Sequence, residues 1–288
     1  MQVLLISLGC PKNLVDSEII LGILQEHGFV ITSNCFEAEI ALVNTCAFIQ
    51  EAKQEAIDTI FELAELKKQG SLKVLIVCGC LAQRYKYELT DLLGEVDAFV
   101  GTGSIGEIDK IIKSCLKGKR CFSFKNNHYL NQPNFHRVLL TPGHYAYIKI
   151  ADGCDNACSY CVIPQIRGRY CSRNIESIAR EAEFLSQKGV KEIILVSQDN
   201  TFYGKDIYGK YCLDVLLKEL VQIKRLHWIR ILYAYPNNIT DNLIKVVARE
   251  QKICKYLDLP IQHINDRILQ LMRRHITGRQ IKDLIFKL

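Results

Sequence analysis

Three cysteines, Cys154, Cys158 and Cys161, lie within eight positions of one another in the stretch ADGCDNACSYCVIP. Thiolates bind zinc and the irons of iron–sulfur clusters. A closed zinc site needs four protein ligands, and no second C-x2-C pair follows at ligand spacing, while a thioredoxin-like C-x2-C would leave Cys154 unexplained. Three thiolates fit a cubane cluster whose fourth iron is free for an exogenous ligand. The alternative is three unrelated buried thiols, which this spacing disfavours.

A second group of cysteines follows the ends of expected strands near the N-terminus. The stretch SLGCPKNLVDSE contains Cys10, VNTCAF contains Cys46, and VCGCLAQR contains Cys78 and Cys80. Loops at one edge of a parallel sheet can bring distant residues together, so Cys10, Cys46 and Cys80 are candidates for one site. Free cysteine is also a common core residue, and by spacing alone a packing role stays open.

The thirteen cysteines of this 288-residue chain indicate metal binding or redox chemistry rather than a disulfide framework. The chain is long, its cysteine number is odd, and its N-terminus has no basic segment or cleavage site of a secretory signal. The apolar run in MQVLLISLGC is too short to span a membrane. We therefore expect a cytoplasmic protein.

Charge is distributed unevenly along the chain. Residues 1–140 contain 14 Lys and Arg against 16 Asp and Glu, whereas residues 141–288 contain 23 against 15. A basic second half suits an anionic partner such as RNA or a ribonucleoprotein. It is equally compatible with an ordinary solvated surface.

Alternating apolar and amphipathic segments predict an α/β domain over residues 1–120. Buried strands are expected at 3–7, 38–44, 73–77 and 97–101, and helices at 13–28, 51–70 and 106–118. This βαβα pattern favours a largely parallel sheet. The polar, basic segment 121–144, which contains two prolines, is interpreted as a linker.

The alternation resumes over residues 145–288. Strands are expected at 145–151, 191–197, 228–235 and 255–260, and helices at 175–188, 213–223, 240–250 and 266–287. Four successive strand–helix units predict a partial, incomplete TIM-like barrel. The chain ends inside the fourth helix, so we expect a truncated barrel.

The motif C-x3-C-x2-C after the first strand of a barrel resembles the signature of the radical S-adenosylmethionine (SAM) enzymes. With the N-terminal cysteines added, the chain is similar to the methylthiotransferase family from residue 2 to its end. LGCPKNLVDSE, GCDNACSYCVIPQIRGRYCSR and LDLPIQHINDRILQLMRRH resemble the branch that modifies a ribosomal protein. The tRNA-modifying branch usually has Gln-Met-Asn where this chain has Pro11, Lys12 and Asn13.

This resemblance implies an α/β domain with an auxiliary 4Fe-4S cluster, followed by a radical SAM barrel with a second 4Fe-4S cluster that binds SAM. The implied ligands of the auxiliary cluster are Cys10, Cys46 and Cys80, and those of the SAM cluster are Cys154, Cys158 and Cys161. The family continues into further barrel strands and a C-terminal TRAM domain, for which we find no counterpart in this sequence.

The reaction implied by the resemblance is methylthiolation of the β-carbon of an aspartate in protein S-twelve of the small ribosomal subunit. A radical route is needed because no side chain is a strong enough base to open this C–H bond. We also expect a flavodoxin-like or ferredoxin-like electron donor and a monomeric protein. The alternatives are a tRNA adenosine methylthiotransferase and a truncated, non-catalytic iron–sulfur or zinc protein.

Polar residues near the second cysteine group are further candidates. VSQDNTFYG places Gln198 and Asp199 at the end of a barrel strand, where they can bind SAM or cap a turn. RGRYCSR contains Arg167, Arg169 and Arg173, which can pair with a carboxylate or belong to a solvated loop. Of these five residues, Gln198 and Arg173 are predicted to lie near SAM.

Other features are interpreted as structural. GTGSIG at 101–106 matches G-x-G-x-x-G, but it follows the fourth strand and lacks an acidic residue about 20 positions later, so a tight turn is favoured. Gln262 and His263 follow the fourth strand, where a lone histidine is more often structural than catalytic, and Trp228 is interpreted as core. Cys78 lies beside the position that matches the family's cluster ligand, so it is left out of the implied ligand set. The cysteines interpreted as packing or surface thiols are Cys35, Cys115, Cys121, Cys171, Cys212 and Cys254.

Overall fold

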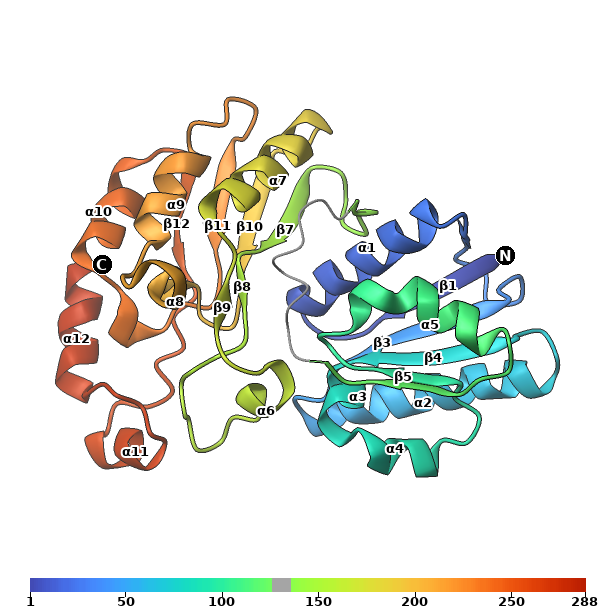
Figure 1. Cartoon of the computed structure of the whole chain (residues 1–288). Helices are drawn as coiled ribbons and strands as arrows, with labels where there is room; N and C mark the ends of the chain where they lie inside the picture. Colours follow the sequence, from blue (N-terminus) through green and yellow to red (C-terminus); the bar gives the residue numbers. More distant parts are fainter. Residues whose placement is uncertain (126–135) are drawn as a thin grey trace. The chain divides into compact units, whose positions relative to one another are not determined.

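The structure is a computed structural model that describes residues 1–125 and 136–288. The chain divides into two compact units, each built around its own parallel sheet (Figure 1). Unit 1 comprises Met1–Leu140 and Gln165–Arg167, and unit 2 comprises Thr141–Pro164 and Gly168–Leu288. In the described ranges, no helix is both long and apolar enough to span a membrane.

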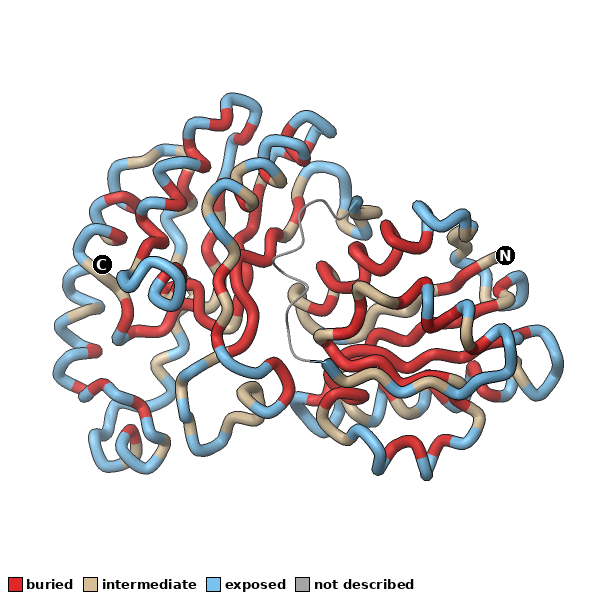
Figure 2. Tube along the Cα trace, viewed as in Figure 1, coloured by how far each residue is buried: buried red, intermediate tan, exposed pale blue. Residues whose placement is uncertain are grey.

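Unit 1 contains a six-stranded sheet in the order β2-β1-β3-β4-β5-β6, in which all neighbours are parallel. The strands are β1 (Gln2–Ser7), β2 (Val30–Ile31), β3 (Ile40–Thr45), β4 (Val74–Gly79), β5 (Ala98–Val100) and β6 (Cys121–Ser123). Every residue of β3 and β4 is buried, as is typical of parallel strands covered on both faces (Figure 2). The predicted α/β domain with a parallel sheet is confirmed.

Helices cover both faces of this sheet. They are α1 (Pro11–Glu26), α2 (Gln50–Lys68), α3 (Cys80–Tyr85), α4 (Tyr87–Leu92) and α5 (Ile108–Cys115), with a 3-10 turn η1 (Ile105–Glu107). Helices α1 and α5 contact each other on one face, and α2 and α3 lie on the other (Figure 1). Pro11 suits the first position of α1, because the N–H that proline lacks has no partner there.

The sheet of unit 1 extends into the segment interpreted as a linker. Strand β6 begins at Cys121, which pairs in parallel with Ala98 of β5. Residues 136–140 also belong to unit 1, where Arg137 forms a buried ion pair with Glu18. The part of the expected linker at 126–135 lies outside the described residues.

Unit 2 contains an open four-stranded parallel sheet in the order β12-β11-β10-β7. Its strands are β7 (Tyr145–Lys149), β10 (Glu192–Val196), β11 (Trp228–Ile231) and β12 (Ile253–Leu257). A separate antiparallel pair joins β8 (Ala151–Asp152) to β9 (Cys171–Ser172). The described residues form no closed barrel, and the expectation of a partial barrel is confirmed in this open form.

Helices α7, α9 and α10 pack side by side along this sheet (Figure 1). The helices of unit 2 are α7 (Ile175–Gln187), α8 (Lys205–Tyr208), α9 (Leu213–Leu220), α10 (Asp241–Arg249), α11 (Asp266–Leu271) and α12 (Gly278–Lys287), with 3-10 turns η3 (Asn200–Phe202) and η4 (Pro236–Asn238). Helix α6 (Ile163–Arg167) has residues in both units.

The expected helix at 266–287 is wrong as a single element, because α11 and α12 are separate helices. After α11 ends, Arg273 takes a left-handed φ of 54°. Helix α12 then begins with a capping box, in which the side chains of Thr277 and Gln280 each bond to the other's backbone N–H. The sequence T-x-x-Q at 277–280 is the signal that the single-helix interpretation overlooked.

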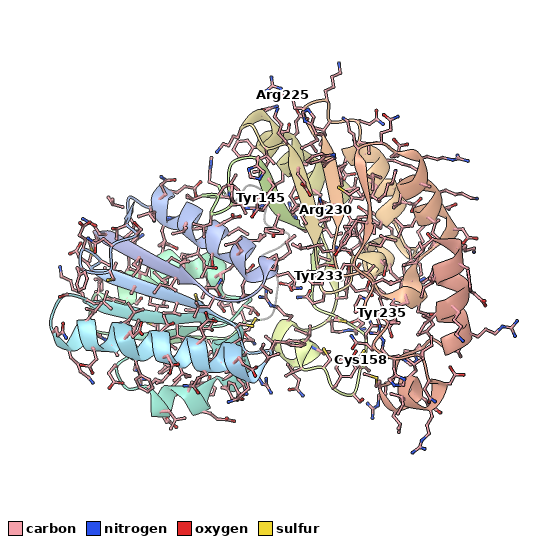
Figure 3. The ribbon with its side chains drawn as sticks, turned by 180° about the vertical axis from the view of Figure 1, so that it is seen from behind. Tyr145, Cys158, Arg225, Arg230, Tyr233 and Tyr235 are labelled. Carbon is pink, nitrogen blue, oxygen red and sulfur yellow. The ribbon has the colours of Figure 1, made fainter. Side chains whose placement is uncertain are left out.

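The interpretation of Trp228 as a core residue is also wrong, because its side chain is 56% exposed. Successive residues of a strand point to opposite faces, and its neighbour Ile229 is fully buried. The partly exposed face of the sheet also carries Tyr145 and Arg230, which Figure 3 labels. On β7 and β11 this face carries aromatic and polar side chains, whereas β10 contributes the aliphatic Ile194 to it.

The alternation along β11 predicts opposite results for two adjacent substitutions. Ile229→Ala should lower the free energy of unfolding by about 2–5 kcal/mol, because it leaves a cavity in the core. Trp228→Thr should change it by no more than about 0.5 kcal/mol, as expected at an exposed position. Urea unfolding followed by circular dichroism measures both. An equal loss in the two variants would contradict the assignment of faces.

Candidate functional site

The strand order of unit 1 creates a switch point between β1 and β3. The chain runs from β1 to β2 on one side and then crosses to β3 on the other. In α/β sheets, ligands bind in the crevice at the carboxyl ends of the strands at such a point. Cys10 follows β1, Cys46 directly follows β3, and Cys80 directly follows β4. The three predicted cysteines therefore lie at the same edge of the sheet.

The loops that carry these cysteines approach one another closely. A Cβ atom built on Gly9 would lie 2.8 Å from the Cβ of Cys46 and 3.4 Å from its Sγ. Burial raises the pKa of Cys80, the nearby Arg167 guanidinium lowers it, and the charges of Cys10 and Cys46 raise it. The three thiols are thus electrostatic neighbours.

Asn13, which is fully buried, connects all three loops. Its Nδ2 donates hydrogen bonds to the carbonyl oxygens of Leu8 at 3.2 Å and Thr45 at 2.8 Å. Its Oδ1 accepts from the Sγ of Cys80 at 3.5 Å. One side chain therefore fixes the segments after β1, β3 and β4, a role that the sequence motif did not reveal.

Arg167 places a buried guanidinium beside Cys80. Its Nη1 donates to Oδ2 of Asp16 at 2.8 Å, and its Nη2 donates to Oδ1 of Asn13 and to Sγ of Cys80, the latter at 3.4 Å. Arg167 thus forms an ion pair with Asp16 of unit 1, and its role at a bound group stays a prediction. Asp16 neutralises it, so the pair contributes hydrogen bonds at Cys80 with little net charge.

Cys78 lies within β4, in the core of unit 1. Its side chain is fully buried, and its Sγ donates to the carbonyl oxygen of Val43 at 3.5 Å. Burial raises the pKa of this thiol. The omission of Cys78 from the ligand set stays a prediction.

In unit 2, the loop that carries the other three cysteines is closed at its base. The backbone N–H of Cys154 donates to the carbonyl oxygen of Gly168 at 3.1 Å. Gly153 has a φ of +77°, and a Cβ there would lie 2.0 Å from the carbonyl oxygen of Arg169. Only glycine permits this approach, which holds both ends of the loop together.

The Cys161 thiol interacts electrostatically with Cys154 and with Cys158, and N–H donors lie near Cys154 and Cys161. The backbone N–H of Cys161 donates to the carbonyl oxygen of Cys158 at 3.0 Å. Burial raises the pKa of Cys154 to about 11, against the lowering effect of the Asn156 amides. Burial also raises the pKa of Cys161, while the backbone N–H of Ile163 lowers it. Such N–H groups stabilise thiolates.

Each of these two groups offers three free thiols to a metal centre. In the ranges that the structure describes, no three or more His, Cys, Asp and Glu side chains are arranged to hold a metal ion. A zinc ion needs all its sulfurs within about 2.3 Å of one centre, whereas each thiolate of a cubane cluster binds a different iron. Cys10, Cys46 and Cys80 lie on three loops and Cys154, Cys158 and Cys161 on one, and either set of three thiols would suit the second kind of group.

Gln198, at the end of β10, has a fixed side chain with a free acceptor. Its Nε2 donates to Oδ1 of Asp152 at 2.8 Å, and the buried Asp152 also pairs with Lys149 at 3.2 Å. The buried Oε1 of Gln198 has no hydrogen-bond partner among the described residues. This oxygen can accept a hydrogen bond from a ligand.

Arg173 and Asp199 make structural contacts. Arg173 donates to the carbonyl oxygen of Lys149 at 2.9 Å and pairs with Glu181 at 2.5 Å. Asp199 caps η3 by accepting from the backbone N–H of Thr201 at 3.0 Å, as the capping alternative predicts. The location of Arg173 near SAM stays a prediction.

The last two sequence candidates form a local turn. Gln262 has a left-handed φ of 67°, and the Nδ1 of His263 accepts from the backbone N–H of Asn265 at 2.9 Å. The structural interpretation of His263 agrees with this contact.

Arg274, between α11 and α12, is a buried residue that the sequence did not single out. Its Nη2 donates to the carbonyl oxygen of Pro260 at 2.7 Å, and its Nη1 lies 3.9 Å from Sγ of Cys158. Its guanidinium carbon lies 4.0 Å from the ring centre of Tyr235. Figure 3 labels Tyr235 and Cys158, which lie in the same region of unit 2. Adjacent arginines in LMRRH give no signal that one of them is buried.

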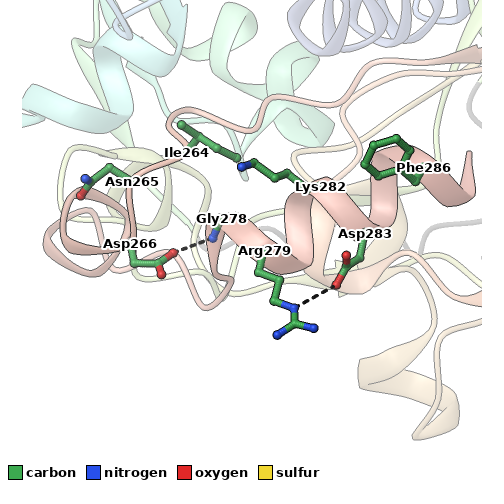
Figure 4. Close-up of a pocket in the computed structure, with 8 residues that line it drawn as sticks. All are labelled: Ile264, Asn265, Asp266, Gly278, Arg279, Lys282, Asp283 and Phe286. Atoms are coloured by element: carbon green, nitrogen blue, oxygen red, sulfur yellow. Dashed lines mark hydrogen bonds and ion pairs between the residues drawn. The ribbon is translucent and has the colours of Figure 1, made fainter.

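A pocket at α11 and α12 contains none of the predicted site residues (Figure 4). The backbone N–H of Gly278 donates to Oδ1 of Asp266 at 2.6 Å, and Arg279 pairs with Asp283 at 4.0 Å. The pocket is lined by Ile264, Asn265, Asp266, Gly278, Arg279, Lys282, Asp283 and Phe286.

Two protein families match the chain. Residues 2–101 match the uncharacterized protein family UPF0004, and residues 148–288 match the radical SAM superfamily. The first match contains Cys10, Cys46 and Cys80, and the second contains Cys154, Cys158 and Cys161. Each family thus coincides with one group of cysteines.

Curated relatives match nearly the whole chain. The ribosomal protein uS12 methylthiotransferase RimO of Lachnoclostridium phytofermentans is 51% identical over 100% of this chain and 66% of its own length. The protein of the same name from Desulforamulus reducens is 52% identical over 99% of this chain and 64% of its own length. The chain therefore spans just under two thirds of the length of these relatives.

The fold is similar to that of solved radical SAM proteins. The methyltransferase TsrM from Kitasatospora setae, solved with tryptophan and a SAM analogue, matches with a TM-score of 0.67. The match covers 99% of this chain and 65% of TsrM at 15% identity. At this identity the likeness concerns the fold alone.

The close approach of the β3 and β4 loops predicts a large effect of Gly79→Ala. Gly79 has a φ of +93°, and a Cβ there would lie 2.3 Å from Oδ1 of Asn44. The substitution should lower the free energy of unfolding by more than about 2 kcal/mol. Gly94→Ala is the matched control, because a Cβ there meets nothing within 4 Å. Equal urea midpoints for the two variants would contradict this packing.

Proposed function

Since the chain belongs to the methylthiotransferase family of radical SAM proteins, we propose that it methylthiolates ribosomal protein uS12, as the names of its RimO relatives indicate. The proposed acceptor is the β-carbon of an aspartate. The observation that carries the proposal is the convergence of Cys10, Cys46 and Cys80 at one sheet edge, in a chain that also contains a C-x3-C-x2-C loop. Insertion of sulfur into the substrate would explain why the chain has a second group of three thiols.

Cys154, Cys158 and Cys161 would hold a 4Fe-4S cluster whose open iron binds SAM. When bound, the two clusters and SAM would supply a radical that removes a hydrogen atom from an unactivated carbon. They would also supply the sulfur and the methyl group that replace this hydrogen. The loop's own part is to keep the three thiolates in place. Gly153 and Gly168 close the loop, and the Asn156 amides lie near Cys154. Both features would hold the thiolates in position.

Cys10, Cys46 and Cys80 would hold the auxiliary 4Fe-4S cluster. Asn13 fixes their three loops relative to one another, and Arg167 donates a hydrogen bond to Cys80. Burial of Cys80 limits the access of water to its sulfur. These contacts position the thiols without providing an acid or base.

Gln198 is our proposed direct contact to SAM. Its free Oε1 would accept a hydrogen bond from a hydroxyl or amino group of SAM, while Asp152 fixes the orientation of the amide. We assign Arg173 to the same region as a positioning residue. Its hydrogen bond to the carbonyl oxygen of Lys149 steadies the end of β7.

A second candidate acceptor is a tRNA adenosine. It is favoured by the basic balance of residues 141–288, in which 23 Lys and Arg face 15 Asp and Glu. The small ribosomal subunit is itself rich in RNA, so the same charge suits a ribosomal substrate. The motif CPKN and the names of the relatives favour uS12.

The proposed reaction implies further partners. The cluster of unit 2 would receive its electron from a flavodoxin-like or ferredoxin-like protein. A ribosomal substrate would place the chain in the cytoplasm, and we propose that it acts as a monomer.

Iron content separates the proposed enzyme from a non-catalytic remnant. Anaerobic reconstitution of the chain should load about eight irons. Cys80→Ala and Cys158→Ala should each reduce this to about four, and only Cys158→Ala should abolish cleavage of SAM to 5′-deoxyadenosine. Cys212→Ala, a buried cysteine outside both groups, is the matched control and should retain about eight irons. Fewer irons in the unaltered chain, or no 5′-deoxyadenosine, would contradict the proposed activity.

The acceptor can be identified by mass spectrometry after deletion of the gene. We expect uS12 to lose the mass of one methylthio group, while methylthioadenosine in tRNA stays unchanged. Restoring the gene should restore the modification. Loss of methylthioadenosine with unaltered uS12 would instead support the tRNA reading.

A further inference from the structure

Arg274 is a buried cation without a carboxylate partner. Arg274 is 7% exposed, and no Asp or Glu in the described parts of the chain forms an ion pair with it. Its Nε has no hydrogen-bond partner among these residues. A charge taken out of water is costly unless it is paired. The compensating negative charge therefore has to come from a group that binds at this position.

Arg274 lies beside Cys158: the Nη1 of Arg274 is 3.9 Å from the Sγ of Cys158. Two hydrogen bonds of the next residue, Ser159, fix the position of Cys158 relative to Arg274. The N–H of Ser159 donates to the carbonyl oxygen of Met272 at 3.1 Å, and its Oγ donates to the carbonyl oxygen of Leu271 at 2.9 Å. The cysteine loop is thereby attached to the segment that leads to Arg274.

The ring centre of Tyr235 lies 4.0 Å from the guanidinium carbon of Arg274. An aromatic ring attracts a cation but does not neutralise it. The contrast with Arg167 is informative, because that buried arginine also contacts a cysteine of a proposed site but is paired with Asp16 at 2.8 Å. Of these two arginines, only Arg274 brings a net positive charge to its thiols.

We propose that Arg274 is the counter-charge of the anionic centre held by Cys154, Cys158 and Cys161, and that it raises the reduction potential of this centre. The inference rests on the proposed function, since it requires a cluster at these thiols. Three thiolates leave a cubane cluster with net negative charge, which grows when one electron is added. A fixed cation nearby stabilises the reduced form more than the oxidised form, and burial prevents water from screening it.

The test uses the full chain with C46A and C80A, so that only the unit 2 thiols bind a cluster. Arg274→Met removes the charge and preserves the length of the side chain, and Arg274→Lys preserves the charge. Arg169→Met is the matched control, because Arg169 lies between α6 and β9 of unit 2 and its side chain is 92% exposed. Iron is counted after anaerobic reconstitution, and the potential is measured by a dithionite titration followed by electron paramagnetic resonance.

We expect a more negative potential for Arg274→Met, a smaller shift for Arg274→Lys, and no shift for Arg169→Met. Full iron content with an unshifted potential in Arg274→Met would overturn the inference. If Arg274→Met binds no iron, the result for Arg274→Lys tests the inference. Iron binding by Arg274→Lys supports a role of the charge. Failure of Arg274→Lys to bind iron shows that the shape of the side chain rather than its charge is required, which overturns the inference. Absence of iron from the parent chain would overturn the proposed function and this inference with it.

Discussion

The parallel pairing of β1, β3 and β4 is the constraint on which the candidate site of unit 1 depends. Because neighbouring parallel strands end at the same edge, the residues that follow them are brought together. An antiparallel β3 would put Cys46 at the opposite edge from Cys10. Gly9 and Gly79 then allow the loops to approach, and Asn13 fixes them there.

The two proposed centres differ in electrostatics although both use three thiols. At Cys80 a buried arginine is balanced by Asp16, so its effect is mainly that of hydrogen bonds. At Cys158 the buried Arg274 has no acidic partner among the described residues and acts through its charge. Hydrogen bonds and net charge are separate means of tuning an iron–sulfur centre. The unit 1 centre thus has hydrogen bonds from a neutralised arginine, whereas the unit 2 centre has N–H donors near Cys154 and Cys161 and, as we propose, the added charge of Arg274.

Much of the fold follows from local sequence signals. The apolar runs of β3 and β4 are typical of strands buried on both faces, and the strand ends predict where Cys46 and Cys80 lie. The expected strand at 73–77 ends before Cys78, whereas β4 runs to Gly79, so strand ends alone did not separate Cys78 from Cys80. The break between α11 and α12 was also readable, from the T-x-x-Q capping box.

Contacts between residues far apart in sequence could not be predicted in this way. The pairing of Asn13 with Cys80 and that of Arg274 with Cys158 depend on how loops from different strands pack. Which face of β11 is buried also depends on the helices that cover it, so the exposure of Trp228 was not evident from an apolar stretch. Local patterns give elements, whereas side-chain partners need the tertiary fold.

Mössbauer spectroscopy of the reconstituted chain, with and without SAM, tests most directly the claim that the cysteine loop of unit 2 leaves one iron open. The account predicts two cubane clusters, and a change on adding SAM that is confined to about one iron in four of one cluster. Cys158→Ala should remove the responsive cluster and leave the other. Identical spectra with and without SAM would contradict the claim.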